Sequence, residues 1–227
     1  FSNGKMYFSG LEDKYPVKYQ KQGSYVGGLF VFESKLTQEF RLHFDEKIAE
    51  MFQSIGIREG SVWIEVFHDG ENYYFNEVGF RYGGSVSIYP VDYFYQINQV
   101  AADIHYALTG ESCISEHTSL IRSTLPRKKY YCIYLHAVNA GTISSISGLD
   151  KIAQLENIVY LATTKYLHDR IESSGSFSQV FALVHFVCNT TEECIQTIDR
   201  IHQMLVVFDE HGNNMVNRML DVGKIIF

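Results

Sequence analysis

Residues 60–84 read GSVWIEVFHDGENYYFNEVGFRYGG, and this stretch decides the fold that the sequence predicts. Two runs of β-branched and aromatic residues, Val62–Phe67 and Tyr73–Val78, flank a short polar segment, which is the pattern of a β-hairpin. Each run carries one carboxylate, Glu65 in the first and Glu77 in the second. Because both runs are apolar on both faces, we expect the hairpin to lie inside a covered sheet. A carboxylate there needs a cation or hydrogen bonds to compensate its burial.

The length of the hairpin loop decides whether the two carboxylates meet. With a two-residue loop, Asp69-Gly70, the side chains of Glu65 and Glu77 lie on opposite faces, because side chains alternate along a strand. With a three-residue loop, Gly70–Asn72, or a bulge of the same parity, Glu65 lies opposite Glu77 with Cβ atoms about 5 Å apart. Two such carboxylates repel unless they share a proton or bind a hard divalent cation such as Mg²⁺. We expect the arrangement in which they meet.

A cation and two glycines follow the second strand directly. Arg81 stands just after the strand, and Gly83 and Gly84 come next. A guanidinium group beside a backbone that glycine leaves accessible suits the binding of a phosphate or a carboxylate. We therefore expect Arg81 to project into the same cleft as the two glutamates.

The segment EVGFRYGG, with Glu65 on the preceding strand, resembles the metal-binding end of the ATP-grasp superfamily, usually written as a carboxylate strand followed by Glu-x-Asn-x-Arg-x-Gly-Gly. By position, Glu65 and Glu77 resemble the ligands that hold Mg²⁺ on the phosphates of ATP. Arg81 resembles the arginine that steadies an acyl phosphate or the acceptor. Gly79 stands at the asparagine position, which removes one oxygen ligand. The alternative interpretation is a hairpin with two incidental acids and a glycine-rich exit.

The resemblance also implies contacts to the nucleotide. Residues 11–24 are polar and lysine-rich and contain a proline and a glycine, which is typical of an exposed loop. In the related amino-acid ligases an Asp-Lys-Tyr segment at such a place lies near the nucleotide, so Lys14 is a candidate cofactor-binding residue, as are Gly83 and Gly84 beside Arg81. A solvated loop without a ligand is the alternative for Lys14.

The beginning of the sequence predicts that the chain is a fragment. Residues 4–8 read like the second arm of a hairpin whose first arm is absent. In ATP-grasp enzymes the residues ahead of this point supply a preceding α/β domain, a glycine-rich loop and the lysines that hold adenine and phosphates. The resemblance therefore covers the last half of the ATP-grasp module, and the N-terminal half becomes an expected partner.

The fold class that we predict is α+β. Residues 1–110 are assigned to the C-terminal half of an ATP-grasp module, an antiparallel sheet with packed helices. Residues 111–129 are assigned to a linker, because they are polar and contain a basic cluster. Residues 130–227 are assigned to a small α+β domain, because strands and helices follow one another there. The order of these elements resembles the C-terminal domain of ATP-dependent L-amino-acid ligases.

Periodicity predicts the individual elements. Apolar residues at spacings of three and four predict an amphipathic helix over 37–54, and a second helix is expected from Asp92 to Leu108. Two runs, 130–137 and 142–147, are expected to form a second hairpin. The segment Thr190–Glu193 has the pattern of a capping box and predicts the start of a helix that extends to residue 205.

Composition limits the location and the partners. The 227-residue chain has a formal net charge of −7, which argues against general nucleic-acid binding. It contains no run of eighteen apolar residues, so no membrane-spanning helix is predicted. In the given sequence no secretory h-region precedes the four cysteines, Cys113, Cys132, Cys188 and Cys194, so we expect reduced thiols in a cytoplasm. Their spacing indicates neither a zinc site nor a disulfide framework.

Two classes of function follow from these observations. The resemblance implies an ATP-dependent carboxylate-amine ligase with ATP and Mg²⁺ as cofactors and a small-molecule carboxylate and amine as substrates, and it is compatible with a homodimer. Chemistry like that of carbamoyl phosphate synthase or biotin carboxylase stays open, because those enzymes share this metal end. The other class is a non-catalytic nucleotide-binding or regulatory module, which Gly79 at the asparagine position favours.

Overall fold

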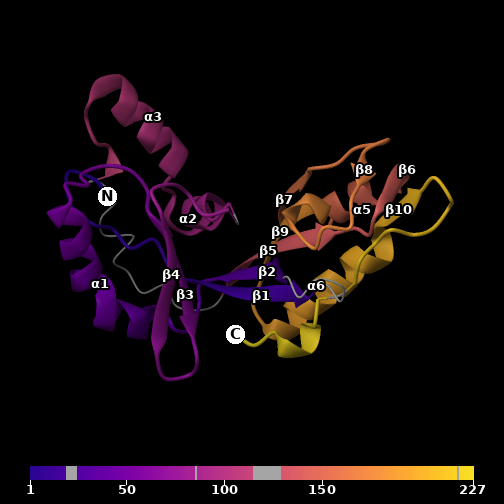
Figure 1. Ribbon diagram of the computed structural model, residues 1–227, viewed down its shortest axis with the longest axis horizontal. Helices are drawn as coiled ribbons and strands as arrows, with labels where there is room; N and C mark the ends of the chain where they lie inside the picture. The colour runs from indigo at the N-terminus through magenta and orange to yellow at the C-terminus, as the bar shows by residue number, and fades with distance from the viewer. Residues whose placement is uncertain (19–24, 85, 115–128, 219) are drawn as a thin grey trace. The chain divides into compact units, whose positions relative to one another are not determined.

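The computed structural model describes residues 1–18, 25–84, 86–114, 129–218 and 220–227 (Figure 1). The chain forms two compact units, which are described separately. The first unit contains Phe1–Leu11 and Lys35–Pro126, and the second contains Glu12–Ser34 and Arg127–Phe227. Most of the predicted linker, 111–129, lies outside the described residues.

The described residues of the first unit form a hairpin and three helices. Its elements are α1 (Thr37–Ser54), β3 (Trp63–His68), β4 (Tyr73–Gly79), α2 (Ile88–Tyr95) and α3 (Gln99–Thr109). Strands β3 and β4 form a two-stranded antiparallel sheet. Helix α1 has the predicted bounds, and its buried Phe40 and Phe52 pack with Ile64 and Val66 of β3. One face of the hairpin therefore rests on α1.

The opposite face of the hairpin is open among the described residues. Phe67 is 58% exposed and Tyr74, which pairs with it, is 54% exposed. The expectation that the hairpin lies inside a covered sheet is therefore wrong for the part of the chain that the structure describes. The physical reason is that a sheet of two strands offers two faces, and α1 packs against one of them. Glu65 alternates with Val66 and so belongs to the open face.

The helix predicted from Asp92 to Leu108 is two helices. Gln96 ends α2 in the left-handed conformation, with φ of 55°. Asn98 then caps α3, because its side chain accepts a hydrogen bond of 2.9 Å from the backbone N–H of Ala101. Gly110 ends α3 with φ of 72°, as the sequence predicts.

Where the structure describes it, the second unit contains two sheets and a long helix. Its larger sheet has the order β1-β2-β5-β9-β7 and is antiparallel throughout, with strands β1 (Glu12–Lys18), β2 (Tyr25–Phe32), β5 (Tyr130–Ala137), β9 (Val180–Cys188) and β7 (Ile158–Thr163). A smaller sheet has the order β10-β6-β8, with strands β10 (Val206–Asp209), β6 (Gly141–Ser147) and β8 (Arg170–Ile171). The helices are α5 (Leu149–Ala153) and α6 (Thr191–Met204), and short 3₁₀ turns occupy Phe177–Gln179 and Val222–Lys224.

Three sequence predictions are corrected in this unit. Residues 12–18, expected in an exposed loop, form strand β1, and the rest of that predicted loop, 19–24, lies outside the described residues. Strands β1 and β2 also belong with the C-terminal unit rather than with residues 1–110, because β2 pairs with β5. The strands β5 and β6 lie where they were expected, but they do not form a hairpin, because they belong to different sheets.

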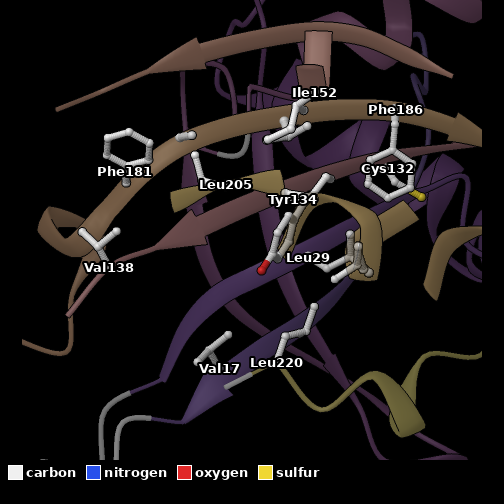
Figure 2. Packing of buried hydrophobic residues seen from close by; sticks show 14 of the residues in the cluster. Val17, Leu29, Cys132, Tyr134, Val138, Ile152, Phe181, Phe186, Leu205 and Leu220 are labelled. Atoms are coloured by element: carbon white, nitrogen blue, oxygen red, sulfur yellow. The ribbon is translucent and has the colours of Figure 1, made fainter. Parts of the chain in front are cut away.

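The core of the second unit lies between the larger sheet and α6. Figure 2 shows Leu29, Tyr134 and Phe186 of the sheet gathered with Leu205, which directly follows α6. The predicted cap of α6 is confirmed, because the side chain of Thr190 accepts a hydrogen bond of 3.1 Å from the N–H of Glu193. Among the described helices, none has both the length and the apolar character that crossing a bilayer requires.

A glycine at the start of α5 provides a test of this packing. Gly148 has φ of 94°, and a Cβ there would overlap the backbone carbonyl of Met204 at the end of α6. Gly212 has φ of 79°, but a Cβ there would meet no described atom within 4 Å. Both alanine variants strain the left-handed backbone, so we expect Gly148→Ala to lose about 2 kcal/mol more unfolding free energy than Gly212→Ala. Denaturant unfolding of the two variants measures this difference, and equal losses would contradict it.

Candidate metal and phosphate site

Glu65 of β3 and Glu77 of β4 lie directly opposite each other. His68 pairs with Tyr73, so the loop has four residues, and neither loop length considered from the sequence is the observed one. A β-bulge between Glu65 and Val66 shifts the register by one residue and leaves Asn76 as the extra residue on β4. The bulge therefore places Glu65 and Glu77 on the same side of the sheet, as predicted, and this side is the open face of the hairpin.

The four-residue loop is held by Asp69. Its Oδ1 accepts hydrogen bonds from the backbone N–H groups of Asn72 (2.8 Å) and Glu71 (2.9 Å), and its Oδ2 accepts one of 3.0 Å from the hydroxyl of Tyr74. These bonds, led by the one from Asn72, lower the pKa of Asp69 to about 2. Because the carboxylate of Asp69 accepts hydrogen bonds from residues throughout the loop, it stabilises the four-residue loop rather than a two-residue Asp-Gly turn.

The bulge adds a third oxygen-bearing side chain. Asn76 donates a hydrogen bond of 2.7 Å from Nδ2 to Oε2 of Glu65, so Asn76 lies on the same face as the two glutamates. Sequence reasoning missed this residue, because strict alternation places Asn76 and Glu77 on opposite faces. The donor set of two carboxylates and one amide oxygen consists entirely of oxygen, which is the ligand type that Mg²⁺ prefers. These residues therefore fit a magnesium ion by their chemistry.

Arg81 reaches the same face of the hairpin. Its Nη2 lies 3.6 Å from Oε1 of Glu77, and the two side chains are 52% and 55% exposed. Its guanidinium lies over the ring of Trp63 at 4.8 Å from the ring centre, and Nη1 donates a hydrogen bond of 2.8 Å to the carbonyl of Tyr82. An ion pair this exposed contributes little to stability. The arginine is therefore available to a stronger anionic partner.

Gly79 explains how Arg81 reaches this position. A Cβ at residue 79 would lie 3.3 Å from both Cγ and Nε of Arg81. Contacts of 3.3 Å are tight, so a larger residue there would press the arginine away from its present place. Gly79 thus makes room for the guanidinium of Arg81 beside Glu77.

The two glycines after Arg81 differ in their surroundings. Gly83 is buried, and a Cβ there would come within 2.8 Å of Cδ1 of Trp63 and 3.0 Å of Oγ of Ser87. Gly84 is exposed, and a Cβ there would meet no atom of the described residues within 4 Å. Gly83 therefore permits the backbone to pass against Trp63, whereas Gly84 leaves its backbone open to a ligand.

Tyr82 anchors the segment between Arg81 and these glycines to α3. Its hydroxyl is hydrogen-bonded to a carboxylate oxygen of Asp103 and lies 3.4 Å from the carbonyl of Gln99. Burial, together with the hydrogen bond to Asp103, raises the pKa of Tyr82. The phenol is thus kept protonated as a donor, and it fixes the loop that carries the arginine.

Lys14 is not among the residues that the hairpin brings together. It lies on β1 of the second unit, opposite Phe30 of β2, and its side chain is exposed. In the first unit, Glu65, Glu77 and Arg81 lie together at the hairpin, as a metal and phosphate site would require, and Asn76 lies beside them.

Solved structures with a similar fold are ATP-grasp enzymes. An L-amino acid ligase from Bacillus licheniformis matches with a TM-score of 0.66 and 21% identity, over 88% of this chain and 51% of that chain. A phosphoribosylglycinamide synthetase from Anaerococcus prevotii matches with a TM-score of 0.73 and 13% identity, over 92% and 51%. The biotin carboxylase domain of 2-oxoglutarate carboxylase from Hydrogenobacter thermophilus, in complex with MgADP, ADP and bicarbonate, matches with a TM-score of 0.66 and 14% identity, over 93% and 44%. Neither models of known families nor curated protein sequences gave a match.

The chain spans about half the length of the solved structures that it matches. It has the fold of the C-terminal part of ATP-grasp enzymes, a mixed α+β arrangement with antiparallel sheets, and the predicted fold class is confirmed. At these identities the likeness shows the fold, so the roles of individual residues depend on the geometry of the hairpin.

Proposed function

We propose that this chain is the metal- and phosphate-binding part of an ATP-dependent carboxylate-amine ligase. The observation that carries the proposal is the opposition of Glu65 and Glu77 across a bulged hairpin, with Arg81 beside Glu77. Two carboxylates that lie side by side repel each other, and a cation bound between them removes this repulsion. The fold shared with ATP-grasp enzymes supports the same assignment.

Each residue has a distinct role in this proposal. Glu65 and Glu77 would hold Mg²⁺, and Asn76 would supply the amide oxygen that Gly79 does not. The ion would neutralise the charge of the ATP phosphates. Arg81 would release Glu77 and donate hydrogen bonds to the oxygens of an acyl phosphate, for which its planar fork is suited. The backbone of Gly84 would approach the same anion.

The proposed reaction consists of two displacements at phosphorus and carbon. A carboxylate oxygen attacks the γ-phosphorus of ATP and ADP leaves, which gives an acyl phosphate. An amine then attacks the acyl carbon, loses a proton and expels inorganic phosphate, so an amide is formed. The chain's own contribution is positioning and electrostatic stabilisation, which is the usual basis of catalysis in phosphoryl transfer.

A non-catalytic nucleotide-binding module is the second candidate. The observation that favours it is the present engagement of Arg81 with Glu77 and Trp63, which Gly79 permits. The test is ADP formation that depends on Mg²⁺ and on a carboxylate and an amine, measured with the protein that carries this chain. Turnover that is lost in Glu77→Gln and kept in Glu71→Gln, an exposed loop carboxylate, supports the ligase. Nucleotide binding without turnover supports the module.

The proposed role of Asn76 can be tested by removing its side-chain amide and then placing an amide at residue 79. We expect Asn76→Ala to weaken binding of Mn²⁺, used as a paramagnetic substitute for Mg²⁺ in the presence of ATP, by about tenfold. Gly79→Asn in that background restores an amide at the usual position and is expected to recover most of the affinity. Unchanged Mn²⁺ binding in Asn76→Ala, with loss in Glu77→Gln, would restrict the ligands to the two carboxylates.

The 227-residue chain by itself is expected to bind MgATP at best with millimolar affinity, or about −4 kcal/mol. Glu65, Glu77 and Arg81 lie on the open face of the hairpin, where they alone offer Mg²⁺ few ligands. The ion keeps its own waters unless substrate oxygens help to replace them. Titration calorimetry on this chain and on a version extended upstream compares the two. Micromolar binding by the 227 residues alone would contradict the prediction.

A further inference from the structure

The second unit contains a cluster of three cysteines that the proposed ligase chemistry does not use. Cys132 of β5, Cys188 of β9 and Cys194 of α6 converge from three different elements. The Sγ atom of Cys132 lies 3.6 Å from that of Cys188 and 3.8 Å from that of Cys194, and all three sulfur atoms lie within 4.8 Å of one another. Figure 2 shows the position of Cys132 in the core. We call these residues the cysteine cluster.

The sheet pairing explains why the sequence spacing hides this cluster. Cys132 pairs with Phe186, and Tyr130 pairs with Cys188, so the two cysteines are diagonal neighbours on one face of the sheet. Helix α6 packs on that face, and the backbone N–H of Cys194 in this helix donates a hydrogen bond of 3.1 Å to the carbonyl of Thr190. The convergence therefore depends on strand pairing and helix docking, and no short Cys-x-x-Cys motif signals it.

We propose that the cysteine cluster binds a soft, thiophilic cation of the Zn²⁺ class. Four ligands in a tetrahedron with metal–sulfur bonds of about 2.3 Å place neighbouring sulfur atoms about 3.8 Å apart. Both measured separations, 3.6 and 3.8 Å, match that edge. Thiolate sulfur selects such cations over the hard Mg²⁺ of the hairpin. The site goes beyond the proposed ligase function and does not depend on it.

Three protein ligands define the coordination. Within the described residues, the group contains no fourth histidine, cysteine or carboxylate. Glu193, the neighbour of Cys194, instead uses Oε2 to accept hydrogen bonds from the backbone and side-chain nitrogens of Asn189, at 2.7 and 2.9 Å. The fourth position is thus left to a small ligand such as water.

Binding exchanges protons for the metal. In the metal-free cluster, a thiol must lose its proton before its sulfur can bind a metal. On binding, each S–H bond that breaks releases a proton to solvent and is replaced by a sulfur–metal bond, without oxidation or reduction. Two released protons balance the charge of a divalent cation, and the loss of a third leaves the complex with one negative charge.

The route of entry is the turn between β9 and α6. Cys188 and Cys194 are 3% and 0% exposed, but Asn189 and Thr190 between them are exposed. Local opening of this turn uncovers two of the three sulfur atoms without unfolding the sheet, because helix ends open at lower cost than core strands. The chain also offers a matched control, because Cys113 lies outside the cluster in the first unit.

The test is titration of the reduced, metal-free chain with Cd²⁺, whose thiolate complexes absorb in the ultraviolet. We expect one equivalent to bind with a charge-transfer band, to raise the melting temperature, and to be displaced only by a large excess of Zn²⁺, because thiolates prefer the softer Cd²⁺. Cys188→Ala and Cys194→Ala are expected to weaken binding by about 10²-fold or more, whereas Cys113→Ala leaves it unchanged. Circular dichroism checks that each variant is folded.

Three results would overturn the proposal. The first is the absence of a charge-transfer band in the folded, reduced wild-type chain. The second is a band that persists in both cluster variants or that depends on Cys113. The third is quantitative formation of a disulfide within the cluster when a mild disulfide oxidant is added together with excess Zn²⁺, because a bound metal protects its thiolates.

Discussion

Arg81→Ala is expected to lower the turnover of the protein that carries this chain by about 10²-fold or more, as for the loss of one donor to a transition state. The reason is that Arg81 is a cation next to Glu77, held over the ring of Trp63. Its ion pair is half exposed, so the substitution removes little stability. The measurement is the steady-state rate of ADP formation at saturating MgATP.

Two further variants make this result specific. Arg81→Lys keeps the charge but loses the planar fork, so we expect an intermediate rate. Arg58→Ala removes another exposed arginine of the first unit and is expected to leave the rate unchanged. Near-normal turnover in Arg81→Ala would reduce Arg81 to a packing partner of Trp63.

Acid is expected to destabilise the second unit through two buried histidines. His136 and His185 are both 0% exposed, and burial lowers their pKa values to about 3 and about 4. The unfolded chain binds protons at both residues below a pKa of about 6.5, whereas the folded chain does not until the pH approaches 4. The stability is therefore complete above pH 6.5 and falls as the pH decreases toward 4.

The expected loss between pH 7 and pH 5 is about 2 kcal/mol for each of these histidines, or about 4 kcal/mol for the pair. Denaturant unfolding at the two pH values measures it. His185→Phe keeps an aromatic ring against Tyr160 but removes the 3.0 Å contact to the hydroxyl of Tyr131, and it should flatten the pH dependence by about half. His211→Gln, at an exposed site, should not change it. A stability that is constant from pH 7 to pH 5 would contradict the prediction.

Local sequence signals predicted the elements that local interactions determine. The sequence predicts the helix over 37–54 with its observed bounds, because apolar residues recur there at spacings of three and four and Gly56 follows it. Thr190 was recognised as a cap, because the hydrogen bond that defines a cap spans three residues. The opposition of Glu65 and Glu77 was also predicted, because strand parity is a short-range property.

Features that depend on distant parts of the chain were not predictable in this way. The sequence of β1 predicts a loop because it contains Pro16 and lysines, but β1 is the edge strand of its sheet, where such residues are tolerated. The partners of β5 are β2 and β9, not the adjacent β6, and no local pattern indicates this choice. Asn76 and the cysteine cluster became visible only with the bulge and with the strand pairing.

The order of strands in the larger sheet has a consequence for how the chain folds. Leu29 of β2 pairs with Tyr134 of β5, about 100 residues later in the chain, and the larger segment of the first unit, Lys35–Pro126, lies between them. During synthesis, the first unit is therefore complete before β2 can acquire its neighbour. Until then the β1–β2 hairpin has two unprotected edges. Substitutions at the β2–β5 junction should thus act on the rate and yield of folding on the ribosome as well as on the stability of the finished protein.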